Sequence, residues 1–260
     1  MSAPSLKFSQ GMPSALYLPA LAIPAMNKLI RLGRYCFAIA FAAFGIQHFI
    51  YAKYATGIGP PWIPGSPLRA CFMGIALLIA SIRILTNAKT RVTAMLLGFL
   101  LFLYFLFLYA PRLATNVHNP APWTSGAEIL ALCGAAWVLA GIPARLGRYL
   151  FALTLTVFGV QHLLYARFVA TLVPSWIPGG HLFWAYAVGI VFIATTLSII
   201  VNIKARLAAT LLGVMFITWV FILHLPRVAS APRNGNEWTS AFVALAMCGG
   251  AWIVAATLQD

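Results

Sequence analysis

A series of long apolar stretches constrains this chain more than any other feature of its sequence. Eight stretches are each about 20 residues long, which is the length an α-helix needs to cross a bilayer. They lack the alternation of apolar and polar residues that marks a β-strand, and an open sheet edge cannot satisfy its hydrogen bonds in lipid. The sequence therefore predicts helical spans at residues 33–53, 68–86, 91–110, 124–142, 147–167, 182–202, 206–225 and 238–257.

The composition agrees with a membrane protein. Hydrophobic residues make up 62% of the 260 residues and charged residues only 8%, whereas soluble domains have about half and about a quarter. The net charge of +14 comes from 17 Lys and Arg against three acidic residues. Because these bases stand singly between apolar runs, they argue against a nucleic-acid partner and for the lipid bilayer.

The chain is an internal duplication. Gly33-Arg34-Tyr35 returns as Gly147-Arg148-Tyr149 at an offset of 114, and after one inserted residue Trp137 matches Trp252 at an offset of 115. Four spans per copy is an even number, so both copies enter the membrane from the same side as parallel repeats. The predicted fold is an all-α integral membrane protein whose eight transmembrane helices form two four-helix bundles. The predicted units are a membrane-surface arm at residues 1–30 and the two bundles at 31–143 and 144–260.

The distribution of bases predicts the orientation. Eleven Lys and Arg fall on the side of the membrane where the chain begins, and six on the other side. The positive-inside rule then places both termini in the cytoplasm, and we expect a multi-pass protein of the bacterial inner membrane.

Polar side chains gather in the outer half of the predicted bundle. His48 and His162 each lie fourteen residues after an arginine at the cytoplasmic surface, so the two imidazoles have equal depth. We expected them to face a shared space. The C-terminal ends of the third and seventh spans lie on the same side of the membrane. The predicted cofactor-binding residues are His48, His162, Gln47, Gln161, Tyr51, Tyr165, Tyr109, His224, Arg112 and Arg227.

Three interpretations of this polar layer stay open at the sequence level. Gln and His inside a membrane bundle can simply hydrogen-bond neighbouring helices. They can also hold a quinone through hydrogen bonds, or the two histidines can ligate haem b from both sides. Catalytic residues are not assigned, and the sequence predicts no metal-ion site.

Other reactive residues have structural interpretations. The four cysteines, Cys36, Cys71, Cys133 and Cys248, are isolated in apolar runs and are interpreted as small buried apolar residues. The spacing of Ser125 and Glu128 predicts a capping box at the start of the fourth span. The repeated loops around Trp62 and Trp176 have the composition of an interfacial aromatic belt, or of a lid over an outer cavity.

One arrangement of motifs resembles a known family. A helix ends in Gln161-His162-Leu163-Leu164-Tyr165-Ala166, and Val173-Pro174-Ser175-Trp176-Ile177-Pro178 then leads into a helix opening with aromatics. This order is similar to that of the DoxX family of four-helix membrane proteins, here in tandem. The resemblance implies a link to membrane oxidoreductase systems, including a quinone-reducing subunit pair. Many single-unit members carry an acidic residue early in the second helix, which neither copy has here.

Two functions are therefore predicted. The first is a quinone- or haem-binding component of a membrane electron-transfer system, which would make the chain an oxidoreductase subunit working with a membrane redox partner protein. The alternative is a non-enzymatic scaffold, assembly factor or accessory subunit of a larger membrane complex. The sequence does not identify the substrate, the electron donor or the oligomeric state.

Overall fold

The computed structural model describes residues 24–51, 67–142 and 144–259, and its regular elements in those ranges are all helices. Two short π-helical turns, η2 and η3, interrupt long α-helices. In chain order the elements are α1 (Pro24–Ile50), α3 (Pro67–Leu85), α4 (Thr90–Tyr104), η2 (Phe105–Tyr109), α5 (Ala110–Thr115), α6 (Pro120–Ala140), α7 (Ala144–Leu164), α8 (Ala166–Ala170), α9 (His181–Val201), α10 (Ala205–Trp219), η3 (Val220–His224), α11 (Leu225–Ser230) and α12 (Gly235–Ala255).

Seven of the helical segments are long and apolar enough to cross a membrane, which confirms the predicted all-helical membrane class. They are Lys28–Ile50, Pro67–Leu85, Thr90–Thr115, Pro120–Ala140, His181–Val201, Ala205–Ser230 and Gly235–Ala255. The helix between them, α7, has 21 residues but is less apolar, because it carries Arg145, Arg148, Gln161 and His162. The loop around Trp62 and residues 1–23 of the predicted arm lie outside the described residues, and α1 already begins at Pro24.

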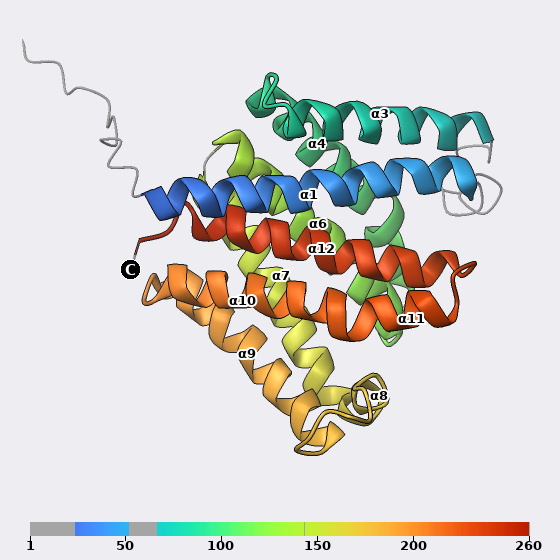
Figure 1. Ribbon diagram of the computed structural model, residues 1–260, viewed down its shortest axis with the longest axis vertical. Helices are drawn as coiled ribbons and strands as arrows, with labels where there is room; N and C mark the ends of the chain where they lie inside the picture. Colours follow the sequence, from blue (N-terminus) through green and yellow to red (C-terminus); the bar gives the residue numbers. More distant parts are fainter. Residues whose placement is uncertain (1–23, 52–66, 143, 260) are drawn as a thin grey trace, which may run out of the picture.

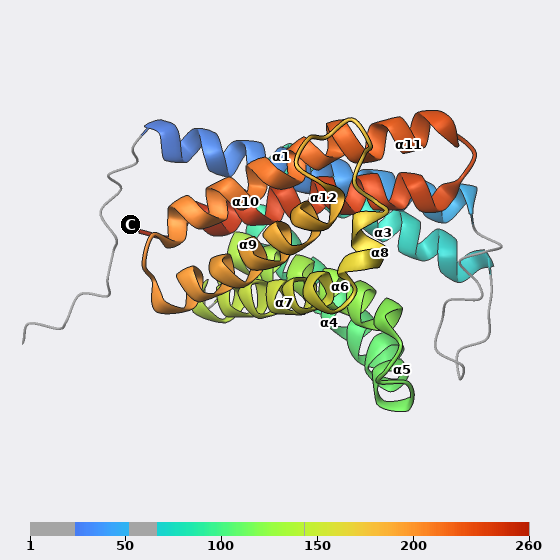
Figure 2. The ribbon, with the colours of Figure 1, turned by 90° about the horizontal axis from the view of Figure 1, so that it is seen from below.

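The helices pack so that the fourth helix of each sequence repeat lies at the centre. α6 and α12 contact each other, α4 packs on α6, and α10 packs on α12 (Figures 1 and 2). These two central spans are 61% buried, against 22–39% for the other five candidate spans. The outer surface of the bundle is therefore apolar and exposed, as lipid contact requires.

The first helix of each repeat packs on the fourth helix of the other repeat. α1 lies along α12 and α3, and α7 lies along α6 and α9 (Figure 1). Small residues make these crossings close: a Cβ on Gly33 would lie 2.9 Å from Gly249 O, and one on Gly134 would lie 2.6 Å from Gly147 O. Small residues at crossings are how membrane helices approach without a hydrophobic driving force. The two repeats therefore interlock.

Buried hydroxyls inside each repeat make equivalent hydrogen bonds. Ser81 Oγ on α3 donates to Ala38 O at 2.7 Å, and Thr196 Oγ1 on α9 donates to Ala152 O at 2.8 Å. An unpaired hydroxyl in an apolar interior costs free energy, so each of these is satisfied by a carbonyl of the neighbouring helix. These bonds fix the first and second helices of a repeat relative to each other.

Candidate functional site

Both candidate histidines have the same local geometry. His48 Nδ1 lies 2.8 Å from Phe44 O, and His162 Nδ1 lies 2.8 Å from Phe158 O. A carbonyl oxygen can only accept, so Nδ1 carries the proton and donates it to the preceding turn of the helix. In the neutral ring the Nε2 atom then holds a lone pair, which is available to a hydrogen-bond donor or a metal.

The imidazole of His162 belongs to an aromatic cluster formed by α7, α9 and α10. Its ring lies 5.2 Å from that of Phe192 in an edge-on arrangement. Phe192 in turn contacts Phe158, Phe216 and Trp219 at ring centroid distances of 5.7, 5.9 and 6.1 Å. A planar, partly polar ligand would find stacking surfaces and one hydrogen-bond acceptor here.

The structure does not bring His48 and His162 to a shared space. His48 lies on α1, which packs on α12. α12 packs on α6, and α6 packs on α7, which carries His162. Two central helices therefore stand between the helices that carry the histidines (Figure 1). His162 faces α9, the second helix of its own repeat. A Cβ on Gly189 of α9 would lie 3.0 Å from His162 Cβ, and Gly74 of α3 lies in contact with Phe49, next to His48.

The two glutamines hold the repeats together. Gln161 Oε1 on α7 accepts from Thr124 Oγ1 on α6 at 2.9 Å, and its Nε2 donates to Pro120 O at 2.9 Å. Gln47 Oε1 on α1 accepts from Thr239 Oγ1 on α12 at 3.3 Å. Its Nε2 atom is buried and has no hydrogen-bond partner in the described part of the chain. The glutamines therefore contact the fourth helices and not the imidazoles beside them.

The tyrosines next to the histidines point to different neighbours. The ring of Tyr51 covers Gly235 at the start of α12, where an added Cβ would lie 2.8 Å from Tyr51 Cζ. Tyr165 caps the short helix α8 and is exposed. Neither is hydrogen-bonded to an imidazole in the described residues, so each site contains one histidine and its apolar surroundings.

Tyr109 and His224 end the two π-helical turns. Pro111 and Pro226 follow two residues later, and proline has no N–H to continue an α-helical ladder, so the chain makes a wider turn. The Arg112 guanidinium lies 5.9 Å from the centroid of the Tyr109 ring, whereas Arg227 Nη2 donates to Leu172 O at 3.2 Å. His224 Nδ1 is buried without a hydrogen-bond partner among the described residues.

The predicted capping box at Ser125 and Glu128 is wrong. α6 begins at Pro120, one turn earlier, and its N-cap is Asn119, whose side chain accepts from Ala121 N at 3.1 Å. Asn234 caps α12 in the same way, accepting from Asn236 N at 3.0 Å. Glu128 instead lies within the helix, more than two turns after its start.

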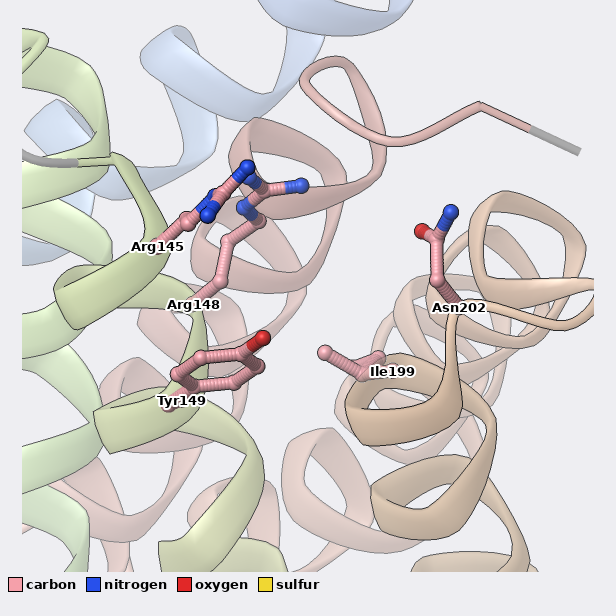
Figure 3. A pocket seen from close by; sticks show the side chains of 5 residues that line it. All are labelled: Arg145, Arg148, Tyr149, Ile199 and Asn202. Carbon is pink, nitrogen blue, oxygen red and sulfur yellow. The ribbon is translucent and has the colours of Figure 1, made fainter.

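Two cavities lie at the end of the bundle opposite to Tyr109 and His224. The arginines at this end were predicted only to set the topology. One, of about 370 Å³, is lined by Arg145, Arg148, Tyr149, Ile199 and Asn202 (Figure 3). The other, of about 230 Å³, is lined by Ile30, Arg31, Arg34, Asn87, Thr90, Arg91 and Leu139. The signal that could have found them is the repeated Arg-x-x-Arg-Tyr at Arg31 and Arg145.

Seven long apolar helices and an apolar exterior define this chain as a multi-pass membrane protein. A family model described as a domain of unknown function (DUF8561) matches residues 151–249, within the second repeat. The chain matches no curated protein and no solved structure.

Proposed function

We propose that this protein is a tandem DoxX-like protein of the bacterial inner membrane that binds quinone in a membrane electron-transfer system. The DoxX resemblance is supported by the His-x-x-Tyr-Ala motif and by the repetition of contacts in both halves, such as Ser81 to Ala38 and Thr196 to Ala152. The proposed units are residues 31–143 and 144–260, each contributing four spans, with the first helix of each packed on the other unit.

One observation carries the quinone proposal: the Nδ1–H of each histidine is held by its own helix, at 2.8 Å in both repeats. The neutral Nε2 atom of such a ring accepts a hydrogen bond, and the hydroxyl of a quinol donates one. The aromatic rings around His162 offer surfaces for a quinone ring. Quinone fits this geometry better than a shared haem b, because α6 and α12 lie between α1 and α7.

The remaining predicted residues have separate roles in this proposal. Gln47 and Gln161 set the position of α1 and α7 against the fourth helices. Tyr109, Arg112, His224 and Arg227 lie at the outer ends of the third spans, where a membrane redox partner protein would approach. Quinone would carry the redox chemistry, while the protein supplies binding and orientation.

The test is a titration of the purified protein in lipid nanodiscs with a short-chain quinol. Trp219 touches Phe192, so quinol bound beside His162 should quench tryptophan fluorescence saturably. His162→Ala removes the acceptor and should weaken binding about tenfold, the effect of one lost hydrogen bond of about 1.4 kcal/mol. The matched control is His118→Ala, because His118 is an exposed histidine in the loop before α6. Equal binding by both variants would overturn the proposal.

The Gln–Thr bonds favour the second candidate, an accessory or scaffold subunit. In that case the polar layer serves only to hold the repeats together, as polar residues in membrane bundles often do. Gln161→Ala would then lower the thermal stability of the purified protein, whereas quinol would quench neither the parent nor the His162→Ala protein. A saturable quench in the parent protein that His162→Ala shifts to about tenfold higher quinol concentration excludes this alternative.

A further inference from the structure

The two cavities at the basic end of the bundle are copies of one site. Arg31 and Arg34 of α1 correspond to Arg145 and Arg148 of α7 at the offset of 114, and Asn87 corresponds to Asn202 at the offset of 115. Each of the two repeats therefore has its own cavity in the folded chain. The side chains that line each cavity come from different helices and a connecting turn. A surface arginine that served topology alone would need neither a second arginine one turn away nor a cavity.

The side chains that line the larger cavity suit an anion with several oxygens. Figure 3 shows the guanidinium groups of Arg145 and Arg148 gathered on one side of the space, with the Asn202 amide across from them and the Tyr149 hydroxyl pointing into the space below the arginines. Guanidinium groups match phosphate oxygens by forked hydrogen bonds. No acidic residue is among the described residues that line either cavity. Two cations held together in this way favour a bound anion.

The smaller cavity shows how such an anion would be held. Arg34 Nη1 donates to Asn87 Oδ1 at 2.5 Å, and Thr90 Oγ1 donates to the same oxygen at 3.0 Å. The Asn87 amide oxygen thus accepts from Arg34 and Thr90, and a phosphate oxygen could accept from the same donors. The Arg34 Nε atom is buried, and the described residues offer it no hydrogen-bond partner. A buried charged donor without a partner is costly, and an anion would supply one.

The turns that close both cavities have unusual backbones. Asn87, Lys89, Asn202 and Lys204 have φ values of 60°, 51°, 57° and 49°, and they are the non-glycine residues with positive φ in the described ranges. Asparagine tolerates this region, but lysine does so at a cost in free energy. The same strained turn in both repeats holds the asparagine amide opposite the arginines.

Apolar side chains beside the cavities distinguish a lipid from a soluble anion. Leu146 and Ile203 flank the larger cavity in sequence and are 52% and 66% exposed, and Leu32 beside the smaller cavity is 50% exposed. In a membrane-spanning chain such side chains meet acyl chains, and the arginines lie at the end of the helices where headgroups begin. A free phosphate would use the arginines but not these residues.

We propose that the cavity between α7 and the α9–α10 turn, and its counterpart between α1 and the α3–α4 turn, each bind the phosphate of an anionic phospholipid. The protein would then carry two lipid sites, one per repeat, on the side predicted to be cytoplasmic. In the larger cavity Arg148 Nη1 donates to Thr257 O at 3.4 Å, whereas in the smaller cavity Arg34 donates to Asn87.

Native mass spectrometry of the detergent-purified protein, titrated with phosphatidylglycerol, tests the proposal. The parent protein should bind two molecules of phosphatidylglycerol in preference to phosphatidylcholine. Arg145→Gln with Arg148→Gln should leave the smaller cavity's site intact and weaken lipid binding at the larger cavity about thirtyfold, since each interfacial base contributes roughly fivefold to the affinity. Arg31→Gln with Arg34→Gln should remove the other site.

The matched control is Arg167→Gln with Arg233→Gln, two exposed bases at the opposite end of the bundle, which should leave both sites intact. If the glutamine variants do not fold, Asn202→Ala provides a milder change and should weaken one site only. Loss of lipid equal in the control and in the site variants would overturn the proposal. So would displacement of the lipid by millimolar inorganic phosphate, because the site would then take a free anion.

Discussion

At the scale of single residues, the contact between Gly213 and Trp252 gives a sharp prediction. A Cβ on Gly213 would lie within van der Waals overlap of the Trp252 indole, 2.4 Å from Cδ1. The indole cannot easily move, because its Nε1 donates to Thr210 O at 3.2 Å. Gly213→Ala should therefore cost about 1–3 kcal/mol of stability, the usual effect of overpacking a buried site.

Thermal unfolding of the purified protein in detergent measures this cost. Gly126→Ala is the matched control, since its Cβ would approach the Phe105 ring at 3.2 Å, a contact that a small shift relieves. An unchanged unfolding temperature for Gly213→Ala would show that α10 and α12 do not approach as closely as the structure has them.

At this scale the sequence predicted which residues repeat but not what they touch. The sequence pairs Trp252 with Trp137 as a repeat, but the contact of Trp252 with Gly213 depends on the packing of α10 on α12, which no periodicity records. The same holds for the histidines. Their equal depth followed from counting residues along a helix, whereas their separation follows from the position of α6 and α12 between α1 and α7.

At the scale of helices, the pairing of α1 with α12 predicts a cross-link between the first and last spans. Cys36 on α1 and Cys248 on α12 are both free, and they stand next to Phe37 and Gly249, where a Cβ on Gly249 would lie 2.5 Å from Phe37 N. Copper phenanthroline, an apolar oxidant, should accept the two electrons as the thiols lose two protons and form a disulfide. We expect an intramolecular product that runs faster on a non-reducing gel and reverts with a thiol reductant.

Cys248→Ser should abolish this product, while Cys71→Ser should not, because α12 packs along α1, which carries Cys36, whereas Cys71 lies on α3. A product that forms equally in both variants would mean that α1 does not lie along α12. The interlocked packing of the repeats would then be incorrect, although the individual helices would remain.

The ends of helices were harder to predict than their existence. The third and seventh spans continue to Thr115 and Ser230, beyond the predicted ends at residues 110 and 225, because the π-helical turn lets the chain pass its proline and remain helical. The capping box at Ser125 failed for a related reason. Asn119 lies just before a proline at the first helical position, which favours a helix start there over one at Ser125. The predicted span, based on apolar residues, begins only at residue 124.

At the scale of the whole molecule, the sequence predicted the membrane class and the duplicated plan, while two features depend on tertiary structure. The first helix of each repeat packs on the fourth helix of the other repeat, and an amphipathic pattern does not show which helix another will pack on. The basic cavities require side chains 50 or more residues apart to meet, as Arg148 and Asn202 do. The number of charges on each side of the membrane predicts a topology for these arginines, but it does not show which of them converge.

The last prediction concerns α7, on which the topology of the second repeat depends. Its 21 residues are about 30 Å long, enough to cross the hydrocarbon core, but it is the long helix with the largest share of polar side chains in the described chain. Its arginines lie in the first two turns, and its glutamine and histidine bond to α6 or to its own backbone. Because these polar groups are satisfied inside the bundle or lie at its end, we expect α7 to cross the membrane.

Reporter fusions check this expectation. A reporter enzyme active only outside the cytoplasm should be inactive when fused after Gly141, at the end of α6, and active when fused after Thr171, beyond α8. A fusion at the C-terminus should again be inactive, because the remaining three spans return the chain to the cytoplasm. Equal activity after Gly141 and Thr171 would place α7 on one side of the membrane, and the two repeats would then have opposite orientations, which their matched contacts do not allow.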